Sequence, residues 1–259
     1  MRILRYGVIW AAMCLPLDAY GADDLHFIPD CAGVVTISQA RVTRVEQDGT
    51  LVLADGRALV LEGIRLPLAD GKSLSRQIMA ALRAMGSDGL VNFTTGAVAK
   101  DRYGRIRVQG FGRAWFQTAL LEQGLAQVRI SPDRAECAPD FYEAEAAARS
   151  RHAGLWALPD HRVRSVARLA GTTGSFQLLE GQVGNIGRAD GRTFIDVGVD
   201  AQNHRLFTAV IGTQDRRAFR DFDFDDLRGR SIRVRGVVQD YRGRPEMMLS
   251  NPYQIEILD

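Results

Sequence analysis

Apolar and polar residues alternate along residues 34–65, and Asp-Gly pairs at 48–49 and 55–56 interrupt the alternation. A period of two places the apolar side chains on one face of a strand, and Asp-Gly pairs favour tight hairpin turns. We therefore predict a meander of three strands in this segment. Apolar residues then recur at helical spacing between Ser73 and Gly86, which predicts one amphipathic helix after the meander.

The rest of the chain continues with alternating strand and helix patterns. In the first half we predict strands at 90–98 and 106–111, and helices at 115–123 and 141–152. In the second half the predicted elements are strands at 176–186, 193–199 and 206–211, a short helix at 214–222, and strands at 231–240, 246–249 and 254–258. Three strands, a helix and further strands is the order of an OB-fold barrel. We expect a mainly β, α+β chain with two five-stranded barrels, the first of which carries three helices.

The composition of the chain changes at residues 157–160, and an arginine-bearing, then Gly- and Thr-rich stretch continues to residue 175. Such stretches are typical of domain boundaries. We therefore place a linker at 159–175, between a first domain at 22–158 and a second domain at 176–259. A length of 259 residues with 46% hydrophobic content suits two modest cores.

Residues 1–21 have the three-part order of a secretory signal peptide. Arg2 and Arg5 begin the segment, an apolar run follows at 6–17, and a small-x-small pattern ends it at 19–21. A membrane-spanning helix needs about 20 apolar residues, so cleavage is favoured over a membrane anchor. We expect an exported chain, periplasmic or secreted, with no membrane span after cleavage.

Two of the three cysteines, Cys31 and Cys137, remain after the predicted signal. An even pair in an oxidising compartment predicts a disulfide. The alternative is two separately buried thiols. With only 4 His in the chain, a metal site built on these cysteines is not expected.

Four segments of the first domain together resemble the staphylococcal nuclease (thermonuclease) family. The segments are Leu-Glu-Gly-Ile-Arg-Leu-Pro at 61–67, Asp-Arg-Tyr-Gly-Arg at 101–105, Leu-Leu-Glu-Gln-Gly-Leu-Ala at 120–126, and a last helix that ends in Gly-Leu-Trp at 154–156. Their order and spacing cover residues 33–158. The resemblance implies an OB barrel with three helices and calcium-dependent hydrolysis of the phosphodiester bonds of DNA or RNA.

This chemistry requires carboxylates for the cation, a carboxylate that activates water, and guanidinium groups that neutralise the transition state. The resemblance places Arg105 at one of the two arginine positions of the family, and Arg102 and Tyr103 beside it become candidate contacts for nucleic acid. The other arginine position holds Val60, which cannot donate to a phosphate. An alternative interpretation of the 101–105 motif is a turn held by salt bridges.

The remaining catalytic positions differ from the family pattern more strongly. Arg65 stands at a metal-binding aspartate, Leu66 at the next ligand, and Leu68 at the general-base glutamate. Asp48 matches the early metal aspartate only after a one-residue slip, which would turn its side chain to the other face of a strand. Asp70 is the remaining carboxylate from which a metal site could be rebuilt.

The two tyrosine positions that frame the nucleotide in the family hold Ile130 and Pro132. We therefore expect nuclease catalysis to be lost or strongly reduced. The alternative is an active calcium-dependent endonuclease that uses Asp48, Asp70 and Arg105. No cofactor is expected in the first case, and calcium in the second.

The second domain resembles OB modules of the anticodon-binding type, and it carries arginines on its predicted fourth strand. Arg233 and Arg235 share one face of this strand, and Tyr241 and Phe207 could stack on bases. The alternative is that these arginines pair with the acidic residues at 221–226. A formal net charge of +2 predicts no strong general attraction to nucleic acid.

These observations leave three hypotheses for the function. The first is a catalytically silent binding module for single-stranded nucleic acid or for an envelope protein. The second is the active endonuclease with a rebuilt site. The third is a structural or interaction protein with no role in nucleic-acid binding.

Overall fold

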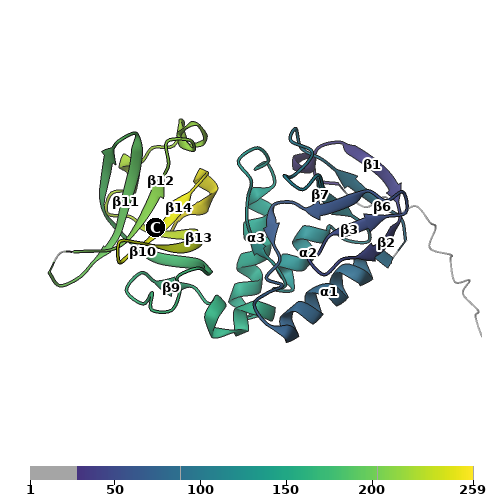
Figure 1. The fold of residues 1–259 in the computed structure, drawn as a ribbon, viewed down its shortest axis with the longest axis horizontal. Helices are drawn as coiled ribbons and strands as arrows, with labels where there is room; N and C mark the ends of the chain where they lie inside the picture. Colours follow the sequence, from purple (N-terminus) through teal and green to yellow (C-terminus); the bar gives the residue numbers. More distant parts are fainter. Residues whose placement is uncertain (1–27, 88, 203, 259) are drawn as a thin grey trace, which may run out of the picture.

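The computed structural model describes residues 28–87, 89–202 and 204–258. The predicted export signal at 1–21 lies outside these residues. No helix in the described ranges is both long and apolar enough to span a bilayer. The described chain forms two lobes that lie side by side, with a β-barrel in each (Figure 1).

The first lobe is built on a six-stranded sheet with the order β1-β6-β7-β4-β3-β2. The strands are β1 (Val35–Ala40), β2 (Val42–Val45), β3 (Leu51–Leu53), β4 (Ala58–Leu61), β6 (Val91–Thr94) and β7 (Ile106–Phe111). Because β1 and β2 stand at opposite ends of this order but are separated only by Arg41, the two ends of the sheet meet and the barrel closes. The predicted three-strand meander therefore gains a strand, since β1 pairs with β6 instead of with its neighbour in sequence.

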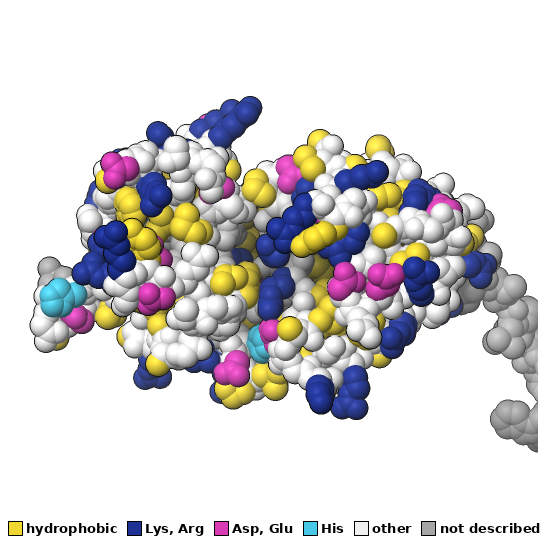
Figure 2. All heavy atoms as spheres, in the orientation of Figure 1, with side chains coloured by type: hydrophobic (Ala, Val, Ile, Leu, Met, Phe, Trp, Pro, Cys, Tyr) yellow, Lys and Arg dark blue, Asp and Glu magenta, His cyan; other side chains and the backbone are white. Residues whose placement is uncertain are grey.

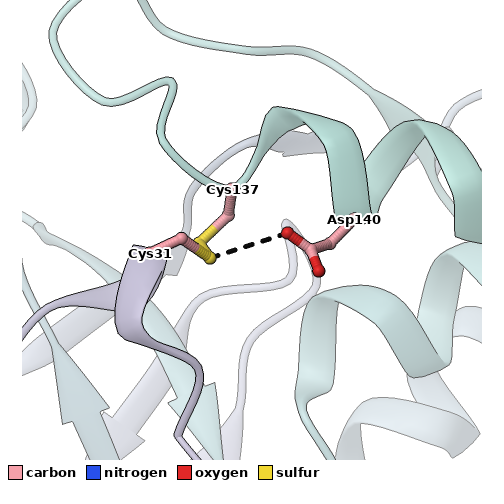
Figure 3. Close-up of side chains that lie close together, drawn as sticks. All are labelled: Cys31, Cys137 and Asp140. Atoms are coloured by element: carbon pink, nitrogen blue, oxygen red, sulfur yellow. Dashed lines mark hydrogen bonds between the residues drawn. A yellow bond between two sulfur atoms is a disulfide. The ribbon is translucent and has the colours of Figure 1, made fainter.

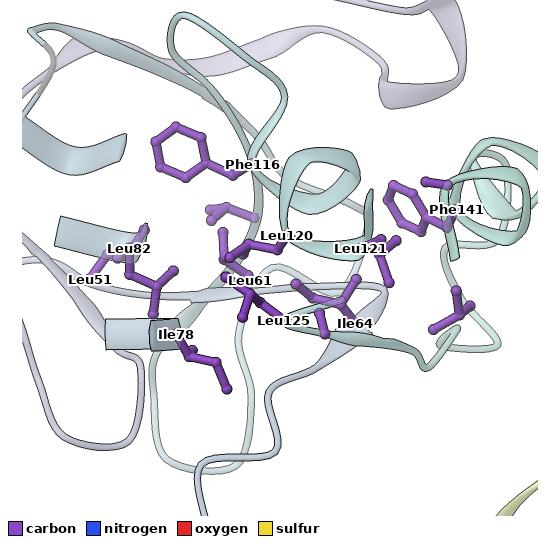
Figure 4. Packing of buried hydrophobic residues seen from close by; sticks show 14 of the residues in the cluster. Leu51, Leu61, Ile64, Ile78, Leu82, Phe116, Leu120, Leu121, Leu125 and Phe141 are labelled. Atoms are coloured by element: carbon purple, nitrogen blue, oxygen red, sulfur yellow. The ribbon is translucent and has the colours of Figure 1, made fainter. Parts of the chain in front are cut away.

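Three helices and a short strand pair complete the first lobe: α1 (Lys72–Ser87), α2 (Phe116–Glu122), α3 (Ala138–Ser150), β5 (Ile64–Arg65) and β8 (Gln127–Val128). The three helices confirm the predicted fold class, a β-barrel that carries three helices. Figure 4 shows how the helices meet the barrel, where Ile78 and Leu82 of α1 and Leu120 of α2 are fully buried with Leu51 of β3. Burial of each such side chain stabilises the fold by about 1.5–3 kcal/mol.

The second lobe is a closed five-stranded barrel with two short additional strands. Its strands are β9 (Arg164–Ser165), β10 (Phe176–Ala189), β11 (Arg192–Val199), β12 (Arg205–Ile211), β13 (Ser231–Tyr241), β14 (Arg244–Leu249) and β15 (Ile255–Ile257). The long strand β10 pairs with β11 along one half and with β13 along the other, which closes the barrel and matches the predicted OB-like order.

The helix predicted at 214–222 is wrong. The segment contains one short 3-10 turn instead, η4 (Arg216–Phe219), and a second, η5 (Asp225–Leu227), follows it. Phe219, Phe222 and Phe224 pack on one another with ring centroids 5.1 to 5.8 Å apart. These contacts place the three rings in one cluster, and their spacing of three and then two residues does not continue a helical stripe.

The segment between the lobes is packed against both of them. In the second lobe, β9 pairs in parallel with β10, and Val166 is part of the barrel core. In the opposite direction, Phe176 and Leu178 at the start of β10 belong to the core of the first lobe. The stretch predicted as a linker at 159–175 is therefore an ordered junction.

Cys31 and Cys137 form a disulfide, which confirms the predicted pairing (Figure 3). The bridge connects the 3-10 turn η1 (Asp30–Ala32) to the start of α3 across 106 residues of sequence. Asp140 Oδ2 lies 3.6 Å from Cys31 Sγ. Because both sulfurs are bonded to each other, they offer no thiolate to a metal ion.

Candidate functional site

Arg105 lies in a turn whose geometry is set by Asp101. The Oδ1 atom of Asp101 accepts the backbone N–H groups of Tyr103 and Arg105 at 2.9 and 3.0 Å, and Gly104 takes the left-handed conformation that closes the turn. The side chain of Arg105 returns to the same carboxylate, with 2.8 Å between Nε and Asp101 Oδ2. The family-like motif is thus a compact loop closed by its own first and last residues.

The guanidinium of Arg105 also contacts the turn between β2 and β3. Its Nη1 atom donates to Asp48 Oδ2 at 2.7 Å and to Thr50 Oγ1 at 3.0 Å. Burial alone would raise the pKa of Asp48, but hydrogen bonds from Thr50 and the charge of Arg105 hold this pKa below its usual value. Arg105 therefore carries a carboxylate on each side, which agrees with the salt-bridge interpretation of the motif.

The early metal aspartate of the family aligns with the residue after Asp48 when no one-residue slip is introduced. Leucine side chains fill the space around this residue. This position is Gly49, which is buried and has a φ of +84°. A Cβ atom built on Gly49 would lie 2.7 Å from Leu66 Cδ1 and 3.5 Å from Leu68 Cδ1. No carboxylate fits there unless Leu66 moves.

Arg65, at the second metal position, participates in a bridge between the lobes. Its Nη2 atom lies 2.9 Å from Asp70 Oδ2, and its Nη1 atom donates to Gln127 Oε1 at 2.7 Å. The guanidinium also lies over the ring of Phe176, 5.3 Å from the centroid. On the other side, Nε2 of the buried His161 is 3.8 Å from Asp70 Oδ2.

Asp70 is thus paired with Arg65, whereas Asp48 is paired with Arg105. Of the three residues proposed for a rebuilt site, the structure brings Asp48 and Arg105 together and places Asp70 with another arginine. Among the described residues, the one group of three potential metal-ligating side chains is Cys31, Cys137 and Asp140, two of which form the disulfide. Calcium needs six to eight oxygen ligands. The leucines around Gly49 and the guanidinium of Arg65 offer no oxygen ligand to this ion.

A groove follows the boundary between the two lobes and begins at the family-like site. One cavity of about 350 Å³ is lined by Val60, Asp101 and Arg107, and by Arg129 to Pro132. A second cavity of about 240 Å³ continues toward Arg65 and Phe176. The two share Arg129, Ile130 and Ser250 in their linings, and Ser250 belongs to the second lobe. Figure 2 shows Lys and Arg side chains along this hollow.

The charges in the groove are mostly paired. Arg107 Nη1 lies 2.8 Å from Asp133 Oδ2, and its Nη2 contacts the buried carboxylate of Glu62. Burial raises the pKa of Glu62, although Arg107 and Arg134 oppose this effect. Arg129 differs from these groups, because its guanidinium is exposed and has no ion-pair partner among the described residues.

Arg102 and Tyr103 lie at the surface beside this site. Tyr103 is 68% exposed, and the guanidinium of Arg102 lies 4.8 Å from its ring centroid. Both side chains are accessible to a ligand that approaches the loop at 101–105.

Arg233 and Arg235 are placed differently from the sequence-based interpretation. Arg235 is only 2% exposed, and its Nη2 atom lies 2.9 Å from Oε2 of Glu145 on α3. Arg233 pairs with Glu180 and Glu256, at 2.5 and 2.9 Å. The acidic run at 221–226 supplies neither partner. Arg235 has no free surface to offer to nucleic acid, so this assignment is corrected to an ion pair between the lobes.

Tyr241 remains exposed at the end of β13, with the guanidinium of Arg242 5.3 Å from its ring centroid. Phe207, the second ring considered for stacking, is buried in the barrel core. One group of arginines that lines a cavity in the second lobe was missed by sequence reasoning. They flank the β10–β11 hairpin at Arg188 and Arg192, and they follow β12 at Arg216, Arg217 and Arg220. The sequence could have indicated them, because arginines are frequent on either side of these two turns.

Comparison with known proteins agrees with the fold of the first lobe. Residues 80–158 match the family model of the staphylococcal nuclease homologues. No curated protein matches the chain significantly. The matched range includes Arg102, Tyr103 and Arg105 and ends after the turn η2 (Gly154–Ala157), whereas the altered positions Arg65 to Leu68 precede it. At residues 80–158 the chain thus carries a domain of the staphylococcal nuclease homologue family.

Proposed function

We propose that this chain is an exported nuclease homologue in which phosphodiester hydrolysis is lost or strongly reduced, and which acts as a binding module for single-stranded nucleic acid. The main support is the packing at Gly49, where Leu66 and Leu68 occupy the space of a metal-binding carboxylate. Export is supported by the Cys31–Cys137 disulfide, which is typical of oxidising compartments.

The proposed loss of catalysis follows from several missing groups. Removal of one positioned general base or one donor to the transition state usually slows an enzyme by about 10²- to 10⁴-fold. Here the positions of the base, one arginine and two metal ligands carry Leu68, Val60, Arg65 and Leu66. Such losses do not add linearly, so the combined loss is expected to be at least as large as that of one group alone.

Binding is supported by the groove between the lobes. Its two cavities share Arg129 in their linings, and this arginine has no ion-pair partner in the described part of the chain. Exposed Arg102 and Tyr103 stand next to the groove and provide a cation and an aromatic face. Positive grooves with neighbouring aromatic rings are typical of sequence-tolerant single-strand binding.

Fluorescence anisotropy of a labelled single-stranded oligonucleotide, measured with EDTA present, tests the binding proposal. We expect micromolar binding that weakens with salt, and a loss of at least threefold in affinity for Arg129→Gln. Arg41→Gln is the matched control, because Arg41 is equally exposed but lies between β1 and β2 outside the groove lining. Absence of binding to the wild-type protein, or equal affinity of both variants, would contradict the proposal.

A further inference from the structure

A cavity in the second lobe, outside the groove, is larger than either cavity of the groove. It has a volume of about 680 Å³ and is formed by the β10–β11 hairpin and the segment after β12. Five arginines line it, namely Arg188, Arg192, Arg216, Arg217 and Arg220, together with one acidic residue, Asp190. We call these residues the arginine pocket. The formal net charge of the whole chain is only +2. Positive charge is therefore concentrated at the pocket, whereas positive and negative charges nearly cancel over the chain as a whole.

The arginines of the pocket form few ion pairs within the described chain, and those pairs are weak. Arg188 approaches Asp225 at 4.0 Å, and Arg220 pairs with its neighbour Asp221 at 3.2 Å, in each case with both side chains more than half exposed. Exposed pairs of this kind contribute about 0–1 kcal/mol and are easily exchanged for another anion. Arg192, Arg216 and Arg217 have no ion-pair partner among the described residues.

The pocket rests on a packed aromatic base. Phe219 and Phe224 are buried with stacked rings 5.7 Å apart, and Phe222 meets both of them edge-on. The guanidinium of Arg188 lies 6.0 Å from the Phe224 centroid. Phe222 is only partly buried, so part of its ring remains accessible at the pocket. Arginines held around an aromatic base combine bidentate donors for phosphate oxygens with a surface for a nucleobase.

We infer that the arginine pocket is a second binding site of this chain, and that it takes the phosphodiester backbone of a single-stranded nucleic acid. This inference rests on the proposed function and extends it to the second lobe. The arginines line a hollow and not a flat face, which favours a flexible strand that can enter it over a lipid surface. The partly accessible ring of Phe222 favours a ligand that carries bases along with phosphates.

The test compares the full chain with Arg192→Gln/Arg216→Gln/Arg217→Gln, using a labelled single-stranded 20-mer over a range of salt concentrations. We expect the affinity of the triple variant to fall at least tenfold. The slope of log K against log salt should become shallower by about 2, since each phosphate contact contributes about 0.7 for single strands. The control variant Arg41→Gln/Arg76→Gln/Arg83→Gln removes the same charge from exposed positions of the first lobe and should change affinity less than threefold.

The outcomes separate this inference from the proposed function. If the wild-type chain binds the oligonucleotide but the pocket and control variants bind equally well, the pocket inference is wrong, while the effect of Arg129→Gln still decides on the groove. If the wild-type chain does not bind the oligonucleotide, both proposals are wrong. If it binds vesicles of phosphatidylglycerol through the pocket but not the oligonucleotide, the nucleic-acid assignment is overturned. Thermal unfolding checks that the triple variant is folded, and the single reversal Arg217→Glu gives a second, less invasive comparison.

Discussion

Arg235 of the second barrel and Glu145 of α3 form a buried ion pair across the boundary between the lobes. The distance from Arg235 Nη2 to Glu145 Oε2 is 2.9 Å, and the side chains are 2% and 0% exposed. Glu145 Oε1 also accepts the backbone N–H of Val128, and Arg235 Nη1 donates to the carbonyl oxygen of the same residue. The pair therefore fixes both the orientation of the second lobe and the segment that leads to Arg129 in the groove.

Breaking this pair should destabilise the whole chain. Glu145→Gln leaves the buried Arg235 with Glu256 as its remaining counter-charge and also removes a partner of Arg149. Loss of one partner of a buried pair costs about 3–5 kcal/mol. The free energy of unfolding, measured by urea titration, should fall by about 3 kcal/mol. Arg57→Gln removes one partner of the exposed Arg57–Asp55 pair and should cost less than about 1 kcal/mol. Equal stability of the two variants would show that the lobes do not depend on the pair.

Removal of the disulfide should lower stability through the unfolded chain. The bridge closes a segment of 106 residues, and loss of a native disulfide typically costs about 2–5 kcal/mol. Cys31→Ser/Cys137→Ser should therefore unfold at a lower urea concentration than the wild-type protein. A reductant should lower the midpoint of the wild-type protein and leave the double variant unchanged; an unchanged wild-type midpoint would contradict the prediction.

The leucine packing around Gly49 can be tested by comparing substitutions at two glycines. Gly49 and Gly56 have nearly the same φ, +84° and +87°, but a Cβ would meet Leu66 at 2.7 Å in the first case and nothing within 4 Å in the second. Replacement by alanine adds the same left-handed strain, about 1–2 kcal/mol, at both positions. We expect Gly49→Ala to cost more than Gly56→Ala, because the terminal methyl group of the half-buried Leu66 must also move aside. Equal costs in urea unfolding would mean that the space beside Leu66 is open.

His161 should make stability depend on pH near the junction of the lobes. Burial lowers the pKa of His161 below 6.5, and Arg65 lowers it further, although Asp70 and Asp160 act in the opposite direction. The unfolded chain therefore takes up the proton first as pH falls, and stability that is complete above pH 6.5 is lost as pH falls toward the folded pKa. Unfolding free energies between pH 7 and 5 should show a shallower decline for His161→Gln than for the wild-type protein. His204→Gln, at an exposed position, should keep the wild-type slope, and an identical slope for His161→Gln would contradict this assignment.

The fold was largely predictable because its elements are encoded by local patterns. Alternation in the barrels and the helical stripe from Leu74 to Leu82 depend only on neighbouring residues. The prediction failed at 214–222, where the Phe cluster packs in a pattern that a short apolar run does not reveal. It also missed the division of the first predicted strand into β1 and β2 at Arg41, because β1 pairs with β6, about 55 residues further along the chain.

The site was less predictable because it depends on contacts between distant segments. Sequence proximity suggested the aspartates at 221–226 as partners for Arg235, whereas the actual partner Glu145 is 90 residues away. The substitution of Arg65 at a metal position was visible in the sequence, but its contacts with Asp70 and Phe176 required the arrangement of the two lobes. The arginine pocket likewise joins residues from two turns that only the closed barrel brings together.

The central claim is that the nuclease site of the first lobe no longer binds calcium or cleaves phosphodiesters. Calcium titration by calorimetry, followed by a cleavage assay on single-stranded DNA and RNA with the same sample, tests it most directly. Our account predicts no saturable calcium binding and no cleavage above the level of Arg105→Ala. Saturable calcium binding together with cleavage that Arg105→Ala abolishes would contradict it and establish an active enzyme.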